Sequence, residues 1–326
     1  MKKRTRTKEI VSAVLILVLL ITMLYSGLQI LESTVFRSGA EEGFVSHTIT
    51  RDGVSYYPRQ DITVVMVLGI DQYGPVTASE GYINPGAADM AMLLIFDEKA
   101  ENCTVLQLNR DTMLEMPALG IGGKQAGTYF GQLALSHTYG SGLEDSCENT
   151  RRTISNFLYG IQIDYYLAMN MDAIAILNDS VGGVTVNVTD DFTQVDPTIH
   201  MGRMTLKGEQ AIHFVRTRKD VGDQLNLSRI DRQKEYIGNF LEAFVKAYEG
   251  NPQFALSTYD TVSPYIVSDC SGTTISALVD RYGDYEIVEV VSPEGENVMG
   301  EEYFEFYVDE EKLDALILRL FYTVKK

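Results

Sequence analysis

The stretch ITVVMVLGI, residues 62–70, is apolar throughout and rich in β-branched residues. This pattern predicts a strand that is buried on both faces of a sheet. Two further apolar runs follow it, MAMLLIFD at 90–97 and CTVLQL at 103–108. The turn-like segment EKAEN joins these two runs, so we expect them to form a hairpin beside the first strand.

Helical and strand-like segments alternate after this hairpin. The segments with helical character are 146–160, 171–183, 271–282 and 308–323, and those with strand character are 163–170, 184–188 and 286–292. Mixed order of this kind predicts an α/β fold in which a central mixed sheet carries helices on both faces, an α/β/α sandwich.

The N-terminal segment indicates the compartment. Residues 10–31 form a run of 22 residues without a charge, which is long enough to cross a hydrocarbon core of roughly 30 Å. Five cations precede the run and predict a cytoplasmic N-terminus. A cleaved signal peptide is the alternative, but the apolar run exceeds the usual length of such segments. We therefore expect a cytoplasmic head at 1–9, a transmembrane helix at 10–31, a stalk at 32–60 and one extracytoplasmic domain at 61–324.

The chain carries 27 Lys and Arg against 45 Asp and Glu, a formal net charge of -18. Nucleic-acid phosphates repel so acidic a protein, so we expect no nucleic-acid partner. Cys103, Cys147 and Cys270 are too few for a disulfide framework, and whether any pair forms a disulfide stays open. The four histidines are scattered along the chain, and we predict no zinc site.

Two aspartates flank the loop between the first two predicted strands. Asp71 follows the strand at 62–70, and Asp89 precedes the strand at 90–97. Ligands gather beyond strand ends in α/β sheets, so these carboxylates could face one another across a cleft. Two carboxylates with waters and a phosphate suit Mg²⁺. Aspartate is also common at turns, so the spacing alone leaves both interpretations open.

Arg110 and Asp111 stand in NRDTM, residues 109–113, directly after the third predicted strand. They therefore lie at the same kind of strand edge as Asp71. An arginine beside an aspartate is often only a surface ion pair, so this motif carries little weight by itself.

Four more arginines gather in FVRTRKDVGDQLNLSRIDRQ, residues 214–233. If HFVRTR continues as a strand, its two-residue period places Arg216 and Arg218 on one face. Two neighbouring guanidinium groups repel one another unless an anion lies between them. Arginine rather than lysine at all four positions favours bidentate recognition of phosphate or carboxylate.

A helix over about 229–248 follows this predicted strand. Its first two turns present Arg229, Arg232 and Gln233 at the end where free N–H groups and the helix dipole favour anions. Ion pairs with nearby aspartates are the alternative, above all for Arg229 beside Asp223 or Asp231.

Seven segments occur in the order of a known family: LGID (68–71), ADM (88–90), LQLNRDT (106–112), IDYYLAMNMDAI (163–174), VGGV (181–184), LKGEQAIHFVRTR (206–218) and SRIDRQKEYI (228–237). Over about residues 61–322 the chain resembles the catalytic domain of the LytR-CpsA-Psr family. The resemblance implies a membrane-anchored extracytoplasmic phosphotransferase. Members move glycopolymers, such as teichoic acids or capsular polysaccharides, from an undecaprenyl pyrophosphate carrier to peptidoglycan, and they hold the prenyl chain in a deep apolar pocket.

The resemblance also implies roles for individual residues. By position, Asp71 and Asp89 match the family's Mg²⁺ carboxylates, and Asp89 or Asp111 could take the proton of the acceptor hydroxyl. Arg110 matches a catalytic arginine that binds the pyrophosphate. The other expected pyrophosphate-binding residues are Arg216, Arg218, Arg232 and Gln233, with Arg229 as a further candidate.

The chain departs from the family at QLALSHTYGSG, residues 132–142, where many members read K-I-N-A-A-Y-A-Y-G-G. The basic residue and the asparagine are both missing, which leaves the acceptor or glycan specificity open. Two other functions also stay open. One is a polyprenyl pyrophosphate hydrolase that uses water as the acceptor, and the other is a non-catalytic envelope regulator that binds lipid pyrophosphate.

Overall fold

The described residues of the computed structural model are 47–120, 124–217, 221, 226–249, 251–270, 274, 277–278, 281–282 and 285–324. The transmembrane helix expected at 10–31 lies outside them, as does most of the helix expected at 271–282. Among the described residues, no helix is both long and apolar enough to cross a membrane. The boundaries expected for the head, the stalk and the domain stay predictions.

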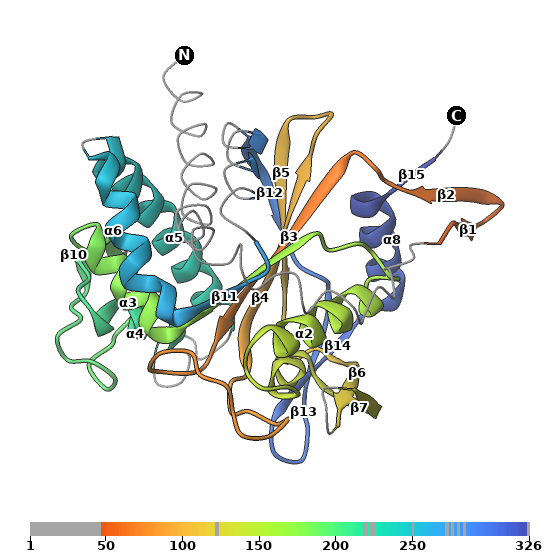
Figure 1. The fold of residues 1–326 in the computed structure, drawn as a ribbon, viewed down its shortest axis with the longest axis horizontal. Coiled ribbons are helices and arrows are strands. Elements are labelled where there is room, and N and C mark those ends of the chain that lie inside the picture. Colours follow the sequence, from red (N-terminus) through yellow and green to blue (C-terminus); the bar gives the residue numbers. More distant parts are fainter. Residues whose placement is uncertain are drawn as a thin grey trace, which may run out of the picture. The chain divides into compact units, whose positions relative to one another are not determined.

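The chain forms two compact units. The first contains Asn170–Ile266 and Ser271–Glu286, and the second contains Val267–Cys270, Ile287–Lys326 and the described residues up to 169. In the second unit the chain builds a six-stranded sheet of order β11–β8–β3–β4–β5–β12 (Figure 1). Its strands are β3 (Ile62–Ile70), β4 (Ala88–Asp97), β5 (Asn102–Leu108), β8 (Tyr165–Asn170), β11 (Ile266–Ser268) and β12 (Glu286–Val291).

The predicted hairpin is confirmed. β4 pairs antiparallel with β5, and β3 pairs antiparallel with β4 along its whole length. The strand expected at 62–70 matches β3 residue for residue. Because the long polar loop after Ile70 returns the chain at Ala88, the two ends of that loop lie side by side at one edge of the sheet.

Both faces of β3 are buried, as its unbroken apolar run predicts. On one face, Val64, Met66 and Leu68 belong to a core that also receives α2 (Glu144–Phe157) and α8 (Glu310–Phe321). On the other face, Val65 and Val67 are buried as well. The predicted central mixed sheet with helices is therefore confirmed, whereas the covering of both faces by helices stays a prediction.

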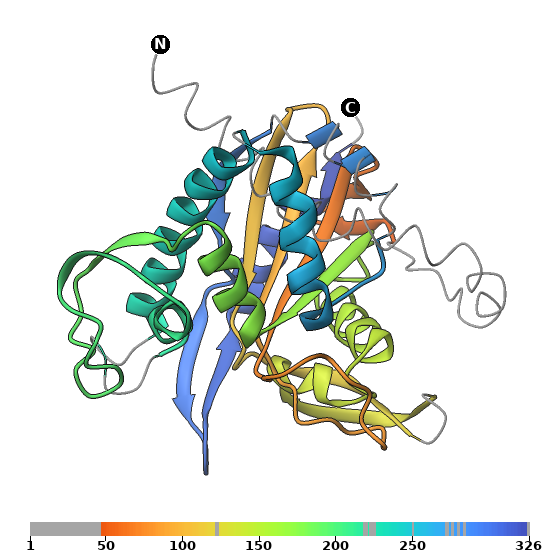
Figure 2. The ribbon, with the colours of Figure 1, turned by 60° about the vertical axis from the view of Figure 1, so that its left-hand side comes forward.

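The sequence patterns did not predict two hairpins and a small sheet in the second unit. The hairpins are β6–β7 (Met113–Leu119 and Gln125–Gln132) and β13–β14 (Gly295–Met299 and Phe304–Val308) (Figure 2). The small sheet joins β1 (Ile49–Arg51), β2 (Val54–Pro58) and β15 (Tyr322–Val324). A short 3-10 helix, η3 (Leu133–Thr138), follows β7 directly.

The first unit is mainly helical. Its helices include α3 (Met171–Ser180), α4 (Glu209–Arg216), α5 (Asn226–Glu249) and α6 (Pro252–Val262). The strand expected at 184–188 forms as β9 (Thr185–Val188), but it pairs with β10 (Gly202–Thr205) in a separate two-stranded sheet. The helix expected from about 229 is confirmed as α5.

The strand predicted for HFVRTR is wrong. This segment completes helix α4, and only at Thr217 does the backbone become extended. The buried side chains Ala211, Ile212, Phe214 and Val215 follow helical spacing, so one helix face packs into the unit. The two-residue period therefore does not relate Arg216 to Arg218, and Arg218 itself lies outside the described residues.

Candidate active site

Arg110 lies just beyond β5, between two carboxylates. Its Nη1 donates a hydrogen bond to Asp89 Oδ1, and its Nε lies 3.4 Å from Asp111 Oδ1. The side chain of Arg110 is 26% exposed, whereas the side chains of Asp89 and Asp111 are 15% and 9% exposed. The result is a partly exposed, oriented cation at the edge of the sheet.

The backbone turn that carries Arg110 is set by Asn109. The N–H of Asp111 donates to Asn109 Oδ1 at 3.0 Å, and the hydroxyl of Thr112 donates to the Asn109 carbonyl at 2.7 Å. A side-chain oxygen that binds the N–H two residues later stabilises a tight turn. The Arg110 carbonyl in turn accepts a hydrogen bond from the Ala134 N–H at 3.0 Å, which ties the turn to η3.

Gln132, at the end of β7, holds Asp111 in place. Its Nε2 donates to Asp111 Oδ1 at 3.1 Å and to the Phe304 carbonyl at 2.8 Å. The Phe306 N–H donates to the Asp111 carbonyl at 2.8 Å, so the β13–β14 hairpin also braces this position. The sequence patterns missed a role for Gln132, although it begins the segment that departs from the family.

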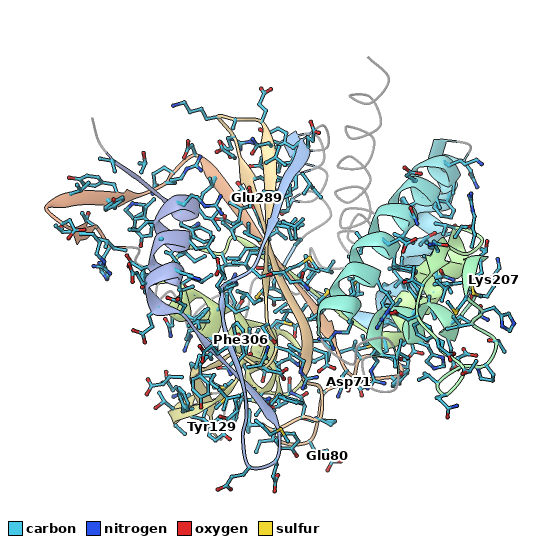
Figure 3. All side chains as sticks on the ribbon, turned by 180° about the vertical axis from the view of Figure 1, so that it is seen from behind. Asp71, Glu80, Tyr129, Lys207, Glu289 and Phe306 are labelled. Atoms are coloured by element: carbon cyan, nitrogen blue, oxygen red, sulfur yellow. The ribbon has the colours of Figure 1, made fainter. Side chains whose placement is uncertain are left out.

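The backbone N–H groups of Asp71 and Asp89 donate to the same backbone carbonyl. The N–H of Asp71 donates to the Ala87 carbonyl at 2.9 Å, and the N–H of Asp89 donates to the same oxygen at 3.1 Å. Asp71 stands at the end of β3 (Figure 3), where the register with β4 shifts between Gly69 and Ile70. The structure thus brings together the two aspartates that the sequence placed at neighbouring strand ends.

The two carboxylates fit the ligand preferences of Mg²⁺. Mg²⁺ keeps several waters and takes only one or two protein carboxylates together with substrate phosphates. Asp71 and Asp89 supply that number of carboxylates. Within the described part of the chain, no group of three or more His, Cys, Asp or Glu side chains is arranged to hold a metal. Two carboxylates are enough for Mg²⁺ that is shared with a phosphate ligand, and Mg²⁺ stays a prediction.

In the first unit, Arg232 is part of the protein interior. Only 4% of its side chain is exposed, and it forms an ion pair with Asp190 through Nη1. Its Nε donates to the Phe214 carbonyl at 3.0 Å, and its Nη2 donates to the Thr217 carbonyl. The guanidinium also lies over the Phe192 ring, 5.4 Å from the centroid. The sequence left open ion pairs between the arginines of residues 214–233 and nearby aspartates. Arg232 does form an ion pair, but its partner, Asp190, is distant in sequence.

Gln233 also donates to a backbone carbonyl, since its Nε2 lies 3.0 Å from the Val215 oxygen. Together with Arg232 it satisfies backbone carbonyls at the C-terminal end of α4, which lack partners inside the helix. Arg216 is the last residue of that helix and its side chain is exposed, while Arg229 in the first turn of α5 is half-buried. Phosphate binding by all four residues stays a prediction.

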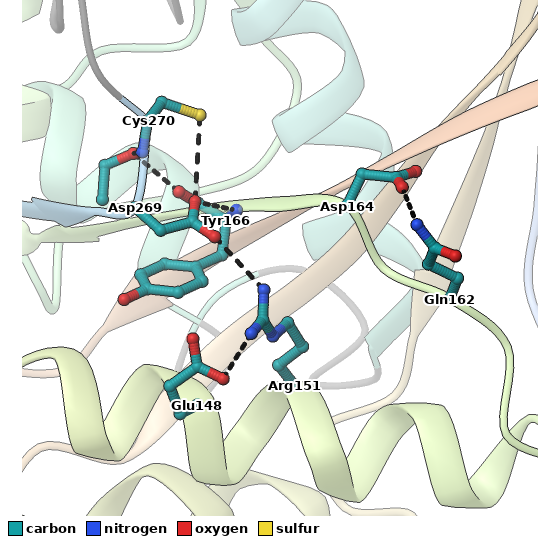
Figure 4. A network of polar contacts seen from close by, with 8 residues as sticks. Glu148, Arg151, Gln162, Asp164, Tyr166, Asp269 and Cys270 are labelled. Carbon is teal, nitrogen blue, oxygen red and sulfur yellow. Dashed lines mark hydrogen bonds and ion pairs between the residues drawn. The ribbon is translucent and has the colours of Figure 1, made fainter. Parts of the chain in front are cut away.

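Two partly exposed acids serve the scaffold of the second unit (Figure 4). Asp269 accepts hydrogen bonds from the Tyr166 N–H at 2.8 Å and from Arg151 at 3.2 Å, and burial raises its pKa to about 6. Asp164 accepts from the Val64 N–H at 2.8 Å, and burial raises its pKa too. Both carboxylates satisfy backbone N–H groups of sheet strands.

Residues 36–320 match the LytR_cpsA_psr family. The chain is 27% identical over 183 residues to a protein of Oceanobacillus iheyensis named polyisoprenyl-teichoic acid–peptidoglycan teichoic acid transferase TagU, a match that covers 56% of this chain and 51% of the relative. The protein of the same name from Bacillus subtilis is 26% identical over 179 residues, covering 55% and 51%. The matched region thus spans about half the length of these curated relatives.

Solved structures share the fold. A protein of Streptococcus agalactiae superposes with a TM-score of 0.64 at 22% identity, covering 80% of this chain and 86% of its own. A structure described as TagT bound to LI-WTA gives a TM-score of 0.59 at 22% identity, covering 86% and 98%. Bacillus subtilis TagV gives 0.58 at 23% identity, covering 80% and 96%.

Proposed function

Because the chain belongs to the LytR-CpsA-Psr family, we propose that it is a membrane-anchored phosphotransferase that moves a glycopolymer from an undecaprenyl pyrophosphate carrier to peptidoglycan. The observation that carries the proposal is the cluster of Arg110 between Asp89 and Asp111 at the sheet edge. Phosphoryl transfer depends mostly on positioning and charge stabilisation, which an oriented guanidinium supplies. The names of the TagU relatives support the same class of reaction.

Arg110 is the residue that exchanges partners in this proposal. A pyrophosphate group carries more negative charge than one carboxylate, so it competes with Asp89 for the guanidinium. Binding of the substrate would turn Nη1 from Asp89 to the phosphate. Asp111 is held by Gln132 and stays beside Nε, so the guanidinium keeps its orientation while it changes ligands.

Asp71 and Asp89 would hold Mg²⁺ in this proposal. The ion, when bound, adds positive charge to the pyrophosphate oxygens. Release of Asp89 from Arg110 would remove one positively charged partner of the carboxylate that would hold the ion. The shared Ala87 carbonyl keeps both aspartate backbones in one place throughout.

The acceptor hydroxyl must lose its proton, and a nearby carboxylate is the natural base. Asp89 is a candidate because the substrate frees it from Arg110. Asp111 is a candidate because Gln132 and the β13–β14 hairpin fix its position. The polyprenyl carrier and its apolar pocket enter the proposal through the family resemblance, as does the anchor at residues 10–31.

The other residues that the family resemblance assigns to the pyrophosphate are Arg216, Arg218, Arg232 and Gln233, with Arg229 as a further candidate. Their contact with it stays part of the proposal. In this chain Arg232 and Gln233 also hold the backbone at the end of the helix that carries Arg216.

The test is a product analysis with the full chain, a lipid pyrophosphate-linked glycopolymer, and peptidoglycan present or absent. We expect glycopolymer attached to peptidoglycan in the presence of Mg²⁺, and loss of that product when the metal is chelated. Asp71→Asn and Asp89→Asn should each slow transfer by about 10- to 100-fold. Equal release of free glycopolymer phosphate with and without peptidoglycan would instead identify a hydrolase. Tight binding of the lipid without turnover would identify the regulator.

A further inference from the structure

A layer of buried side chains lies behind Asp71 and Asp89. Gly86 precedes Ala87, whose carbonyl holds both aspartates. The Gly86 N–H donates to Asn84 Oδ1 at 2.8 Å, and the Gly86 carbonyl lies 2.8 Å from His137 Nδ1. The two polar groups of Gly86 are thus both held by side chains, and those side chains are almost wholly buried.

The contacts of His137 define its tautomer. A carbonyl oxygen can only accept, so Nδ1 of His137 carries the proton that bonds to Gly86. Burial lowers the pKa of His137, which favours the neutral ring. In that form Nε2 is an acceptor, and the thiol of Cys147, a weak donor, lies 3.9 Å away. The ring therefore connects helix α2 to the loop that ends at Ala87.

Asn84 closes the network from the other side. Its Nδ2 donates to the His137 carbonyl at 2.8 Å, to the Gly140 carbonyl at 3.2 Å and to Ser146 Oγ at 3.1 Å. Asn84 thus binds both the backbone of the residue that holds Gly86 and the start of α2. A buried network whose members are satisfied has one low-energy arrangement, because each displacement breaks several hydrogen bonds.

The position of Gly86 leaves little room for movement. A Cβ added there would lie 2.8 Å from Ile70 Cγ2 and 2.9 Å from Gln72 Cδ. The backbone at Gly86 therefore packs directly against both neighbours of Asp71. A shift of this backbone would move the Ala87 carbonyl relative to the end of β3, and with it the spacing of the two aspartates.

We propose that His137 is a positioning residue for the carboxylate pair. Through its hydrogen bond to Gly86 it fixes the Ala87 carbonyl, and that carbonyl sets how Asp71 and Asp89 face their ligand. The use of the pair as a Mg²⁺ and pyrophosphate site rests on the proposed function. The hydrogen bonds that connect His137 through Gly86 and Ala87 to the two aspartates do not depend on the proposed function.

Three variants of the full chain separate positioning from stability. His137→Phe keeps a ring of similar size but removes the donor to Gly86. His137→Asn places an amide N–H near the position of Nδ1 and restores that donor. Thr153→Val is the matched control, because Thr153 is fully buried and donates to the Asn149 carbonyl in the same helix, without contact to Gly86.

The first readout is hydrogen–deuterium exchange of peptides that contain the Asp71 and Asp89 amides. Loss of one buried hydrogen bond is worth about 1.4 kcal/mol, so His137→Phe should speed exchange there about tenfold. His137→Asn and Thr153→Val should exchange at the wild-type rate in these peptides. Unchanged exchange in His137→Phe, with a fall in melting temperature like that of Thr153→Val, would show that His137 is merely structural and overturn the proposal.

The second readout is Mg²⁺ binding by calorimetry. We expect His137→Phe to bind about tenfold more weakly than wild type and His137→Asn to recover most of that loss, because residues behind the ligands tune metal affinity. If the wild type bound no Mg²⁺ while exchange still rose in His137→Phe, the metal role in the proposed function would fail and the positioning role would stand. Wild-type Mg²⁺ affinity in His137→Phe, without faster exchange, would contradict the positioning role.

Discussion

Arg110 and Arg232 were both predicted to bind pyrophosphate, yet their surroundings in the structure differ. Arg232 is 4% exposed and satisfied by one carboxylate, two carbonyls and an aromatic ring. Arg110 is 26% exposed, and both of its partners are carboxylates. A cation that acts on a substrate needs exposed surface and partners that the substrate can replace. The contrast therefore favours Arg110 over Arg232 for the proposed contact with substrate.

The number of interactions that a ligand would have to break also separates the two arginines. A phosphate at Arg110 needs to displace only the bond to Asp89, and Asp111 keeps the guanidinium in place. A phosphate at Arg232 would have to break the caps on Phe214 and Thr217 at the end of α4. We therefore expect Arg232 to contribute to folding and Arg110 to contribute to turnover.

The largest effect on stability is expected for Arg232→Ala. Removing one partner of a buried ion pair leaves an uncompensated charge, so the free energy of unfolding should fall by about 3–5 kcal/mol. Denaturant unfolding measures this fall. The matched control is Arg51→Ala, because Arg51 is 49% exposed and pairs with Asp314 at 2.8 Å. That surface pair should contribute little to stability. Similar losses in both variants would remove the distinction that the comparison draws.

A smaller effect, dependent on pH, is expected for Asp269→Asn. The pKa of Asp269 is about 6 in the folded chain and 3.8 without the protein environment. The folded state therefore binds the proton of Asp269 more tightly than the unfolded state does. The stability that this proton contributes is lost as pH rises from about 4 to about 6. Asparagine cannot ionise, so the stability of the variant relative to wild type should rise across this window. Partial exposure limits the change to about 1–2 kcal/mol.

Asp61→Asn is the control variant, for which we expect stability relative to wild type to change with pH in the opposite direction. The hydrogen bond from Arg59 lowers the pKa of Asp61 below 3.8 in the folded chain. The ionised Asp61 thus stabilises the fold above pH 4, and this contribution is lost as pH falls below it. Relative to wild type, Asp61→Asn should therefore become less stable as pH rises from about 3 to about 5. Equal slopes for the two variants would contradict the raised pKa assigned to Asp269.

Sequence patterns predicted the centre of the fold well. The run at 62–70 is apolar at every position because both faces of β3 are buried, and that burial is what the pattern records. Asp71 and Asp89 were placed correctly because strand ends in adjacent antiparallel strands must meet. Arg110 and Asp111 followed from the same reasoning, since they come directly after β5.

The parts that failed depend on contacts between distant residues. HFVRTR alternates charge and apolar character like a strand, but the spacing of Ile212 and Val215 suits a helix face equally well. The sequence patterns did not identify Asp190 as the partner of Arg232 or Gln132 as the partner of Asp111. No local pattern indicates a partner that lies 42 or 21 residues away. His137 escaped for the same reason, since its function depends on a loop 51 residues earlier.

The most direct test of the account is the rate of glycopolymer transfer to peptidoglycan by Arg110→Ala, measured beside its unfolding free energy. Arg110 is proposed to stabilise the transferring phosphate, so the rate should fall by about 100- to 1,000-fold. Its guanidinium is partly exposed, so stability should fall less than in Arg232→Ala. A stable Arg110→Ala variant that transfers glycopolymer at the wild-type rate would contradict the central claim.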